Sequence, residues 1–448
     1  MASKPAIAVS GLIFVSSFTQ AVDIERITTL RFETTFDVDR QAHHVESDRI
    51  NTIIDSEWVI SDDNFTWVLG GRVKTDFLDN YGVRQSEFHS YSQLSDPINI
   101  GDHSYLELRN FYLDYSPDEC DFDADSCSWK IGKQQVVWGQ ADGIKVLDVV
   151  NPQSFEYFIL DEYDDSRIPL WTVNYELGFE NSELQILWIP DTTGHFVPEP
   201  WYAYGNRSVF FEPSPIFHGP PASFEPIDSP TISLSNSDFG FKYATFLDGW
   251  DLSVHYLYKL SDFYAMYSDR VIINDRPRTR FRFDTNRNHV IGATATNSFG
   301  DLTVRTEMVY TTNRVSTSFR TDNGTFRANN LTWVLGLDWY GFGDAMISAQ
   351  YISDTMKGKN VLANRGKYED IFTLLYRESF INDKLSIKVI FEHVLGLDDG
   401  LVRYSAGWDI DDESMIQLEF NQFYGKEYGT FGQYGKNDHF RLNYEYTF

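Results

Sequence analysis

The sequence predicts an all-β protein, a transmembrane antiparallel up-and-down β-barrel of about 18 strands. Three observations support this fold class. Apolar and polar residues alternate with a period of two in many segments, the last such segment ends on Phe448, and the chain begins with a short apolar leader. Together they favour a closed sheet with one face toward lipid and one toward water.

The 448-residue chain is rich in aromatic residues but not hydrophobic overall. Phe, Tyr and Trp make up 16% of the residues, whereas the mean hydropathy is −0.35. Membrane helices need about 20 consecutive apolar residues, and no such stretch follows the leader, which excludes a helical bundle. The formal net charge of −29 argues against a nucleic-acid partner, because phosphate binding needs a basic surface.

Residues 1–21 are expected to be a cleavable signal peptide, followed by one barrel domain over residues 22–448. Lys4 provides the positive start, and Thr19 and Ala21 are small residues at positions −3 and −1 of a cleavage site. A buried N-terminal helix is the alternative. The prediction places the protein in the outer membrane of a Gram-negative bacterium, with lipid and lipopolysaccharide around it and the barrel-assembly machinery as a partner.

The alternation is clearest in the second half of the chain. Apolar residues occupy every second position from Trp250 to Leu260, with Asp251, Ser253, His255 and Lys259 between them. Similar patterns begin at Leu302, Leu331 and Leu385, and the last one runs from His439 to Phe448. A terminal amphipathic strand that closes on an aromatic residue resembles the sorting signal of bacterial outer-membrane barrels.

Turn residues set the strand count. Short connections rich in Gly, Asn and Asp alternate with longer stretches such as 261–279, 312–327, 354–366 and 423–437. This is typical of barrels with short periplasmic turns and long extracellular loops. The count is about 18 strands, with 16 as the alternative, and both termini are expected in the periplasm. The alternation changes phase around Asn110, which predicts a β-bulge.

The two cysteines, Cys120 and Cys127, are predicted to form a disulfide, because exported proteins commonly oxidise such pairs. Two free thiols are the alternative. Asp121, Asp123 and Asp125 between them have the spacing of the first ligands of a calcium loop, but the Gly and the final Glu of that loop are missing. No metal and no cofactor is therefore expected.

The segment 133–171 is longer and more apolar than a solvated loop, so it is expected to fold into the barrel as a constriction. A loop packed over the outer mouth is the alternative. If the segment lies inside, its polar and aromatic residues line the pore. These candidates are Trp138, Gln140, Asp142, Lys145, Asp148, Asp161, Glu162, Asp164 and Asp165.

Within this segment, the run VVWGQADGIKVLDVVNP followed by DDSRIPLW resembles the segment that marks domain-of-unknown-function family 1302. The match covers about 40 residues. The resemblance implies an outer-membrane barrel associated with exporters of the resistance-nodulation-division (RND) type and with a periplasmic lipid-binding protein. It implies a role in envelope transport of lipids or other hydrophobic molecules, and it supplies no catalytic residues.

An arginine ladder is the second candidate for the pore lining. Every second position is an arginine at Arg276, Arg278, Arg280 and Arg282. Further along the same expected strand, the odd positions Ile291, Ala293 and Ala295 are apolar, which suggests that the arginines at even positions face the lumen. Opposite the acidic residues of segment 133–171 they would create a transverse field. The alternative places them at the outer rim, where they would pair with lipopolysaccharide phosphates.

The third feature is a long extracellular loop over residues 191–235, rich in proline and aromatic residues. It is expected to pack down as a lid or to bind an apolar ligand.

The sequence thus predicts a channel that passes or hands over a small or hydrophobic (lipid-like) molecule. A non-conducting docking barrel of an export system is one alternative, and an outer-membrane enzyme is another. No catalytic constellation can be assembled from the spacing, so the chain is not expected to be an enzyme.

Overall fold

The computed structural model describes residues 22–38, 48–78, 90–101, 103–139, 146–198, 204, 222–225, 227–273, 275–318, 321–357, 368–426 and 429–448. The predicted signal peptide lies outside the described residues. The main sheet contains 19 strands, of which the short β4 (Ile98–Ile100) pairs only with β5, so 18 strands form the wall. β1 pairs with both β2 and β22, which closes the sheet into a barrel. The predicted count of 18 is confirmed.

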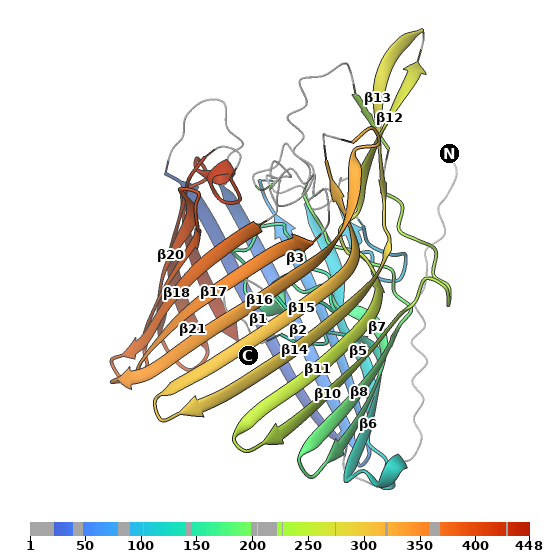
Figure 1. Ribbon diagram of the computed structural model, residues 1–448. Coiled ribbons are helices and arrows are strands. Elements are labelled where there is room, and N and C mark those ends of the chain that lie inside the picture. The colour runs from blue at the N-terminus through green and yellow to red at the C-terminus, as the bar shows by residue number, and fades with distance from the viewer. Residues whose placement is uncertain are drawn as a thin grey trace, which may run out of the picture.

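The wall strands pair antiparallel with their neighbours in chain order (Figure 1). They are β1 (Asp23–Asp37), β2 (Arg49–Asp62), β3 (Phe65–Asp76), β5 (Ser104–Tyr115), β6 (Ser126–Gln134), β7 (Leu170–Phe179), β8 (Ser182–Ile189), β10 (Asp238–Leu247), β11 (Trp250–Leu260), β14 (Arg287–Phe299), β15 (Leu302–Thr317), β16 (Thr325–Phe342), β17 (Ala345–Lys357), β18 (Tyr368–Phe380), β19 (Leu385–Val394), β20 (Asp399–Asp409), β21 (Ser414–Tyr424) and β22 (His439–Thr447).

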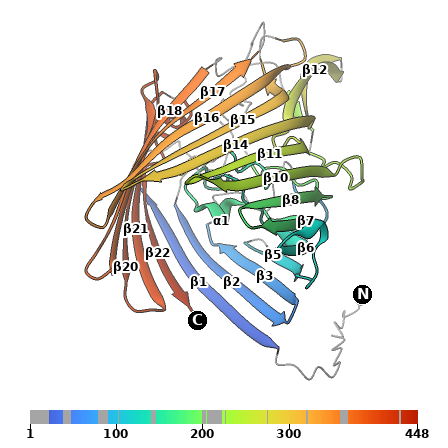
Figure 2. The same ribbon diagram turned by 60° about the horizontal axis from the view of Figure 1, so that its bottom comes forward.

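The remaining elements lie in the connections. β12 (Ala265–Ile273) and β13 (Arg276–Asp284) form a hairpin that pairs with β9 (Ala222–Phe224) in a separate three-stranded sheet. The one α-helix among the described residues, α1 (Tyr163–Ser166), lies within the ring of strands (Figure 2). Two short 3-10 turns are η1 (Asp121–Asp123) and η2 (Gly432–Tyr434).

The two ends of the barrel differ as the turn pattern predicts. One end, the turn end, carries short connections such as 180–181, 248–249 and 343–344, and Phe448 pairs there with Thr28. The opposite end, the loop end, carries the long connections and the β12–β13 hairpin (Figure 1). Several stretches expected as loops are partly strand, because β15, β16 and β17 extend beyond the region where the sequence alternates cleanly.

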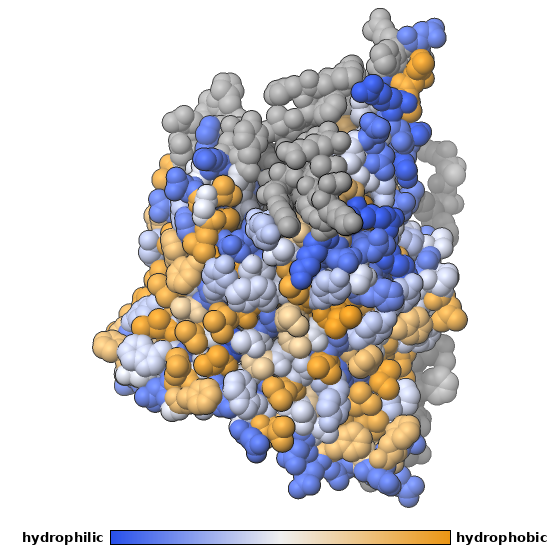
Figure 3. Space-filling view, viewed as in Figure 1, coloured by the Kyte–Doolittle hydropathy of each residue, from blue (hydrophilic) through white to orange (hydrophobic). Residues whose placement is uncertain are grey.

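The distribution of side chains is inverted relative to a soluble protein. On β22, Phe440 and Leu442 are more than 40% exposed, whereas Arg441 between them is 5% exposed. Orange residues accordingly spread over the outside of the wall, with blue residues at the turn end (Figure 3). Since lipid tails solvate apolar side chains and the closed sheet satisfies the backbone, this arrangement suits a membrane.

The predicted bulge is present on β5. Asn110 pairs with Gly70 and Leu108 with Gly71, so Arg109 is the extra residue. On its other edge, β5 pairs with β4 through Ser104–Leu106 and with β6 through Phe111–Tyr115. Residues 107–110 therefore have no strand partner there among the described residues. This is the level at which the chain leaves β6 and turns into the barrel.

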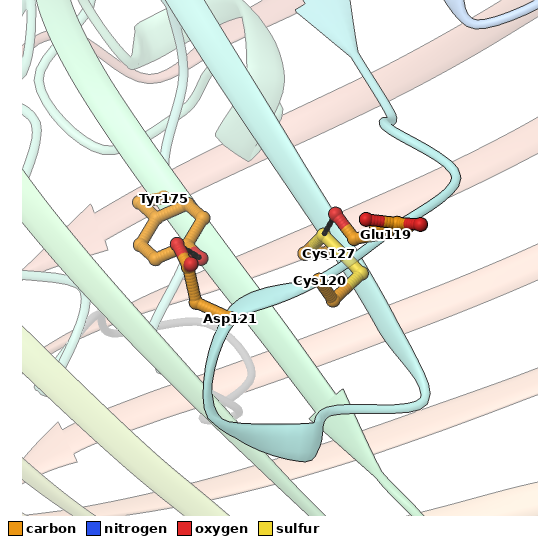
Figure 4. Close-up of a disulfide and its surroundings, with 5 residues drawn as sticks. All are labelled: Glu119, Cys120, Asp121, Cys127 and Tyr175. Atoms are coloured by element: carbon orange, nitrogen blue, oxygen red, sulfur yellow. Dashed lines mark hydrogen bonds between the residues drawn. A yellow bond between two sulfur atoms is a disulfide. The ribbon is translucent and has the colours of Figure 1, made fainter.

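The predicted disulfide joins Cys120, in the connection between β5 and β6, to Cys127 near the start of β6 at the turn end (Figure 4). Asp121 beside it accepts a hydrogen bond of 3.2 Å from the Tyr175 hydroxyl on β7. The disulfide therefore closes a turn that this hydrogen bond also ties to the wall.

Replacing both cysteines with serine is expected to lower the free energy of unfolding by no more than about 2–3 kcal/mol, because the closed loop is short. Their separation is seven residues. Urea unfolding in lipid vesicles checks the value, and the ion conductance should not change. A marked conductance change would show that this turn also controls the lumen.

Candidate functional site

The segment between β6 and β7 fills much of the barrel interior. Gln134 at the end of β6 pairs with Leu170 at the start of β7, so the two strands are neighbours and their connection leaves from one point of the wall. We call its residues 135–169 the inserted segment. Of these, residues 135–139 and 146–169 are described.

The first part of the inserted segment packs against one side of the wall. Val136, Trp138, Leu147 and Val150 are all less than 5% exposed. They form an apolar cluster with Leu187, Ile189, Leu257, Val290 and Val309, which point inward from β8, β11, β14 and β15. The Trp138 indole Nε1 donates a 2.7 Å hydrogen bond to Gln185 on β8.

A glycine in the wall makes this approach possible. A Cβ on Gly292 of β14 would collide with Cδ1 of Leu147. Because Leu147 is fully buried against the wall, the absence of a side chain at residue 292 lets the inserted segment lie close to the sheet.

The second part packs against the next stretch of the wall. Phe155, Tyr157, Phe158 and Leu160 form a second apolar cluster. Its wall members are Val334, Ile352, Ile371, Val394, Leu401 and Phe423 on β16 to β21. Tyr204 of the loop after β8 belongs to the same cluster. Its hydroxyl oxygen is 3.3 Å from Nδ1 of His439 on β22. Together the two clusters hold the inserted segment against the wall from β8 to β21.

Ion pairs fasten the acidic turn of the inserted segment to basic residues of the wall. Asp165 pairs with Arg31 of β1 at 2.8 Å and with Arg72 of β3. Other pairs join Glu156 to Lys74 of β3 at 2.6 Å and Glu162 to Lys388 of β19 at 2.8 Å. Asp161 lies 3.6 Å from Arg441 of β22. We call this set of wall residues, Arg31, Arg72, Lys74, Lys388 and Arg441, the basic wall.

The basic wall affects the two neighbouring carboxyl groups differently. Burial alone would raise the pKa of Asp165, but Arg72 and Arg31 outweigh it and hold this pKa well below its usual range. For Asp161 burial dominates and raises the pKa to about 6, although Arg49, Arg441 and Lys74 act in the opposite direction and Glu33 adds to the rise. Asp165 is therefore a permanent charge, whereas Asp161 titrates near neutral pH.

Open space remains in several places around the inserted segment. Between the inserted segment and β14 to β18 there is a cavity of about 300 Å³. We call it the side cavity. Toward β3 and β5 only about 60 Å³ remains, lined by groups that include Arg72, Lys74 and Arg109. Nearer the turn end, a polar space of about 510 Å³ is lined by residues such as Lys130, Glu176 and Lys242.

The predicted pore-lining residues of the inserted segment are divided by the structure. Asp161, Glu162 and Asp165 contact the basic wall, and Asp148 pairs at 2.6 Å with Arg167 of the same segment. The side chain of Asp164 is 89% exposed and pairs with Arg167. Trp138 is buried against β8 rather than open to the lumen. Gln140, Asp142 and Lys145 lie outside the described residues.

The prediction for the arginine ladder was wrong. Arg278, Arg280 and Arg282 belong to β13, which pairs with β12 and β9 and is no part of the wall. Arg280 and Arg282 have side chains about 40% exposed and pair with Asp269 of the same hairpin at 3.5 and 3.2 Å. β13 ends at Asp284, and residues 285–286 separate it from β14. The alternation of inward and outward positions around Ile291 therefore does not extend back to the arginines.

The basic wall was missed by the sequence analysis, although each of its residues carries a local signal. Arg31 alternates with the outward Leu30 and Phe32, and Arg441 with Phe440 and Leu442. Basic residues at the inward positions of several different strands, and not a row of arginines along one strand, are the signal that predicts the basic wall.

Among the described residues, no group of three or more His, Cys, Asp or Glu side chains is placed to hold a metal ion. No helix in the described part of the chain is long and apolar enough to cross a membrane.

A closed 18-stranded barrel with a connection folded inside has the fold of the outer-membrane porins. Acinetobacter baumannii OccAB3 is similar to the chain with a TM-score of 0.52 at 10% identity, over 95% of this chain and 99% of the other. Acinetobacter baumannii OccAB2 gives 0.50 at 9% identity, over 95% and 98%. A search of curated protein sequences gave no match.

The family is shown by a direct match of the sequence. Residues 54–448 match the family model described as "Protein of unknown function (DUF1302)". The chain belongs to this family, as the run within the inserted segment predicted.

Proposed function

We propose that the protein is an outer-membrane channel in which the inserted segment narrows the lumen and leaves the side cavity as the path for solute. The observation that carries this proposal is that the inserted segment lies inside the barrel and is fixed to the wall by apolar packing and ion pairs. Ion pairs tie it to the basic wall, and beside it a cavity of about 300 Å³ remains open, lined in part by residues of β14 to β18. In this proposal the turn end faces the periplasm and the loop end faces outward.

The chemistry of the side cavity favours a small molecule with an apolar body. Phe155, Phe158, Val290, Val309 and Ile352 line it together with polar groups such as Asn288 and Thr332. A mostly apolar lining with a few placed polar groups is typical of small-molecule sites. We therefore propose that the channel transports hydrophobic molecules. Its proposed partners are an RND-type exporter and a periplasmic lipid-binding protein.

Recording of the purified protein in planar bilayers tests the channel. Single channels of low and steady conductance are expected, because the inserted segment leaves little continuous water. A protein that inserts but never conducts would contradict the proposal and favour a docking barrel.

Ion selectivity is expected to depend on pH through Asp161. Its pKa of about 6 means that the carboxyl group is charged above this pH and loses its charge as the pH falls through it. Between about pH 8 and about pH 5 the lumen should therefore become less cation-selective. The charged groups that face it from the wall are Arg49, Arg441, Lys74 and Glu33.

The reversal potential in a salt gradient measures this change. Asp161→Asn should give the low-pH selectivity at both pH values. A pH response that survives in this variant would assign the titration to another group.

A further inference from the structure

The wall is not a continuous ladder of strands between β5 and β7. β6 pairs with β5 only up to Phe111 and ends at Gln134, whereas β5 continues to Ser104 toward the loop end. The short β4 pairs with part of the edge of β5 that β6 has left. We call the part of the wall between residues 104–110 of β5 and the start of β7 the window. In hydrocarbon every backbone amide needs a partner, so the window needs a cover of another kind than a full strand.

Residues 90–100, which include β4, cover the window, and we call them the closing segment. Side chains hold its middle, because Ser92 Oγ and Ser95 Oγ both donate hydrogen bonds of 2.5 Å to the carboxylate of Asp191 after β8. Asp191 is buried. One shared carboxylate therefore fastens the closing segment where the rest of the wall has a ladder of backbone hydrogen bonds.

Single hydrogen bonds join the closing segment to its other neighbours. The Gly194 amide donates to the Ser90 carbonyl at 2.9 Å. Trp171 at the start of β7 donates from its indole Nε1 to the Leu94 carbonyl at 3.0 Å. Regions with few backbone hydrogen bonds open at a lower free energy than the paired strands of a sheet. We therefore expect the closing segment to open more readily than the wall around it.

The outer face of the closing segment belongs to the lipid-facing surface. Ile98 is the cross-strand partner of Leu106 on β5, and Leu106 pairs in turn with Val73 of β3, which pairs with Ile54 of β2. Ile54, Leu106 and Ile98 are exposed, and so is Ile100 two residues further on. The apolar row of the wall thus continues onto the closing segment, which places this segment against lipid.

The inner face of the closing segment borders the lumen. Asn99 is the cross-strand partner of Tyr105, and both line the cavity of about 60 Å³ that lies toward β3 and β5. Pro97 of the closing segment, Ile168 of the inserted segment and Phe196 of the loop after β8 line it too. The closing segment is therefore a thin layer with lipid on one side and the lumen on the other.

The same small cavity contains two ion pairs beside its apolar side chains. Glu107 lies 3.1 Å from Arg109, and Lys74 lies 2.6 Å from Glu156. Paired charges can form hydrogen bonds with a polar head group, whereas Ile168 offers an apolar contact. Since only about 60 Å³ lies behind the closing segment, one hydrocarbon chain fits there more readily than the several chains of a membrane lipid.

We propose that the closing segment is a lateral gate, through which a single-chain amphiphile such as a fatty acid passes between the lumen and the surrounding lipid. The proposal rests on the proposed transport of hydrophobic molecules, because it names their class and their route. A closing segment that never opens would only seal the wall, and the experiment below distinguishes the two cases.

An engineered disulfide that locks the closing segment tests the gate. Ser92→Cys with Thr193→Cys joins the segment to the connection after β8, at two side chains whose oxygens are 3.2 Å apart. The protein is placed in vesicles with a palmitic acid that carries a photoactivatable diazirine in its chain, and mass spectrometry maps the labelled peptides. With reduced thiols, label is expected on the peptides that contain Ile168 and Phe196, behind the closing segment. After oxidation this label should be lost.

A second disulfide is the matched control. Thr75→Cys with Ser104→Cys joins β3 to β5, which are already paired, at side-chain oxygens 2.9 Å apart. Its oxidation should leave the label behind the closing segment unchanged. Because a reductant also acts on the native disulfide between Cys120 and Cys127, the unmodified protein is labelled under both conditions and should give the same result in each.

The double variant Ser92→Ala with Ser95→Ala tests the gate without a new covalent bond. It removes two donors from Asp191, which keeps hydrogen bonds from Thr193 and from the backbone amide of Trp171. The closing segment should open more often, so the label behind it should increase.

Label behind the closing segment that survives oxidation of the lock would overturn the inference, because the probe would then enter from an end of the barrel. Absence of this label from both the reduced protein and the serine variant would overturn it as well. Bilayer recording judges the channel separately. A conducting protein without this label would refute only the gate, and a labelled protein that never conducts would refute only the channel.

Discussion

Asp165→Ala is expected to loosen the inserted segment and to raise the single-channel conductance. Asp165 is the shared partner of Arg31 and Arg72, whose side chains are 18% and 12% exposed. Removing it leaves two largely buried guanidinium groups with fewer partners, although Glu445 and Asp55 remain at 3.3 and 2.7 Å. Breaking such a pair costs about 3–5 kcal/mol where no other partner remains. We therefore expect a loss of about 2–3 kcal/mol in the free energy of unfolding.

The same variant should shift the ion selectivity toward anions, because it removes a carboxylate whose pKa is held well below the usual range by its arginine partners. Asp164→Ala is the matched control. The side chain of Asp164 is 89% exposed and pairs with Arg167 of the same segment, not with the basic wall. Urea unfolding and bilayer recording measure both effects. If Asp165→Ala and Asp164→Ala behave alike, the ion pairs with the basic wall do not hold the segment.

Gly292→Val is expected to push the inserted segment away from β14. The new Cβ would overlap Leu147, which is fully buried against the wall. Overpacking of this kind costs about 1–3 kcal/mol, and it should also give a larger or noisier conductance. Thermal unfolding followed by circular dichroism and bilayer recording measure the two effects.

A second substitution tests the cause of this effect. Leu147→Ala in the Gly292→Val background removes the overlapping side chain and should restore part of the lost stability, because residues in contact are energetically coupled. Gly336→Val on β16 is the control, since the nearest atom to a Cβ there is Gln350 Cγ at 3.5 Å. A Gly336→Val variant as unstable as Gly292→Val would mean that any branched residue in the wall, and not the contact with Leu147, is responsible.

The wall of the barrel could be predicted from the sequence because each strand carries its own evidence. The side-chain period of two is a local property, and it also located the bulge at Arg109 within one residue of Asn110. The disulfide was equally local, since its two cysteines are separated by seven residues.

The contacts of the lumen could not be predicted in the same way. Asp165 meets Arg31 and Arg72, which are 134 and 93 residues away in the chain. Which strand faces which part of the inserted segment depends on the closure of the barrel, and alternation does not encode it. The arginines of β13 show the opposite error, because a regular local pattern formed a hairpin outside the wall.

In the proposed channel the inserted segment narrows the lumen. Because Gln134 and Leu170 are strand partners, residues 135–169 can be replaced by a two-residue Asn-Gly hairpin turn without stretching the wall. Single-channel recording of this variant beside the unmodified protein should show a conductance several times larger and a weaker selectivity. Equal conductance of the two proteins would contradict the claim.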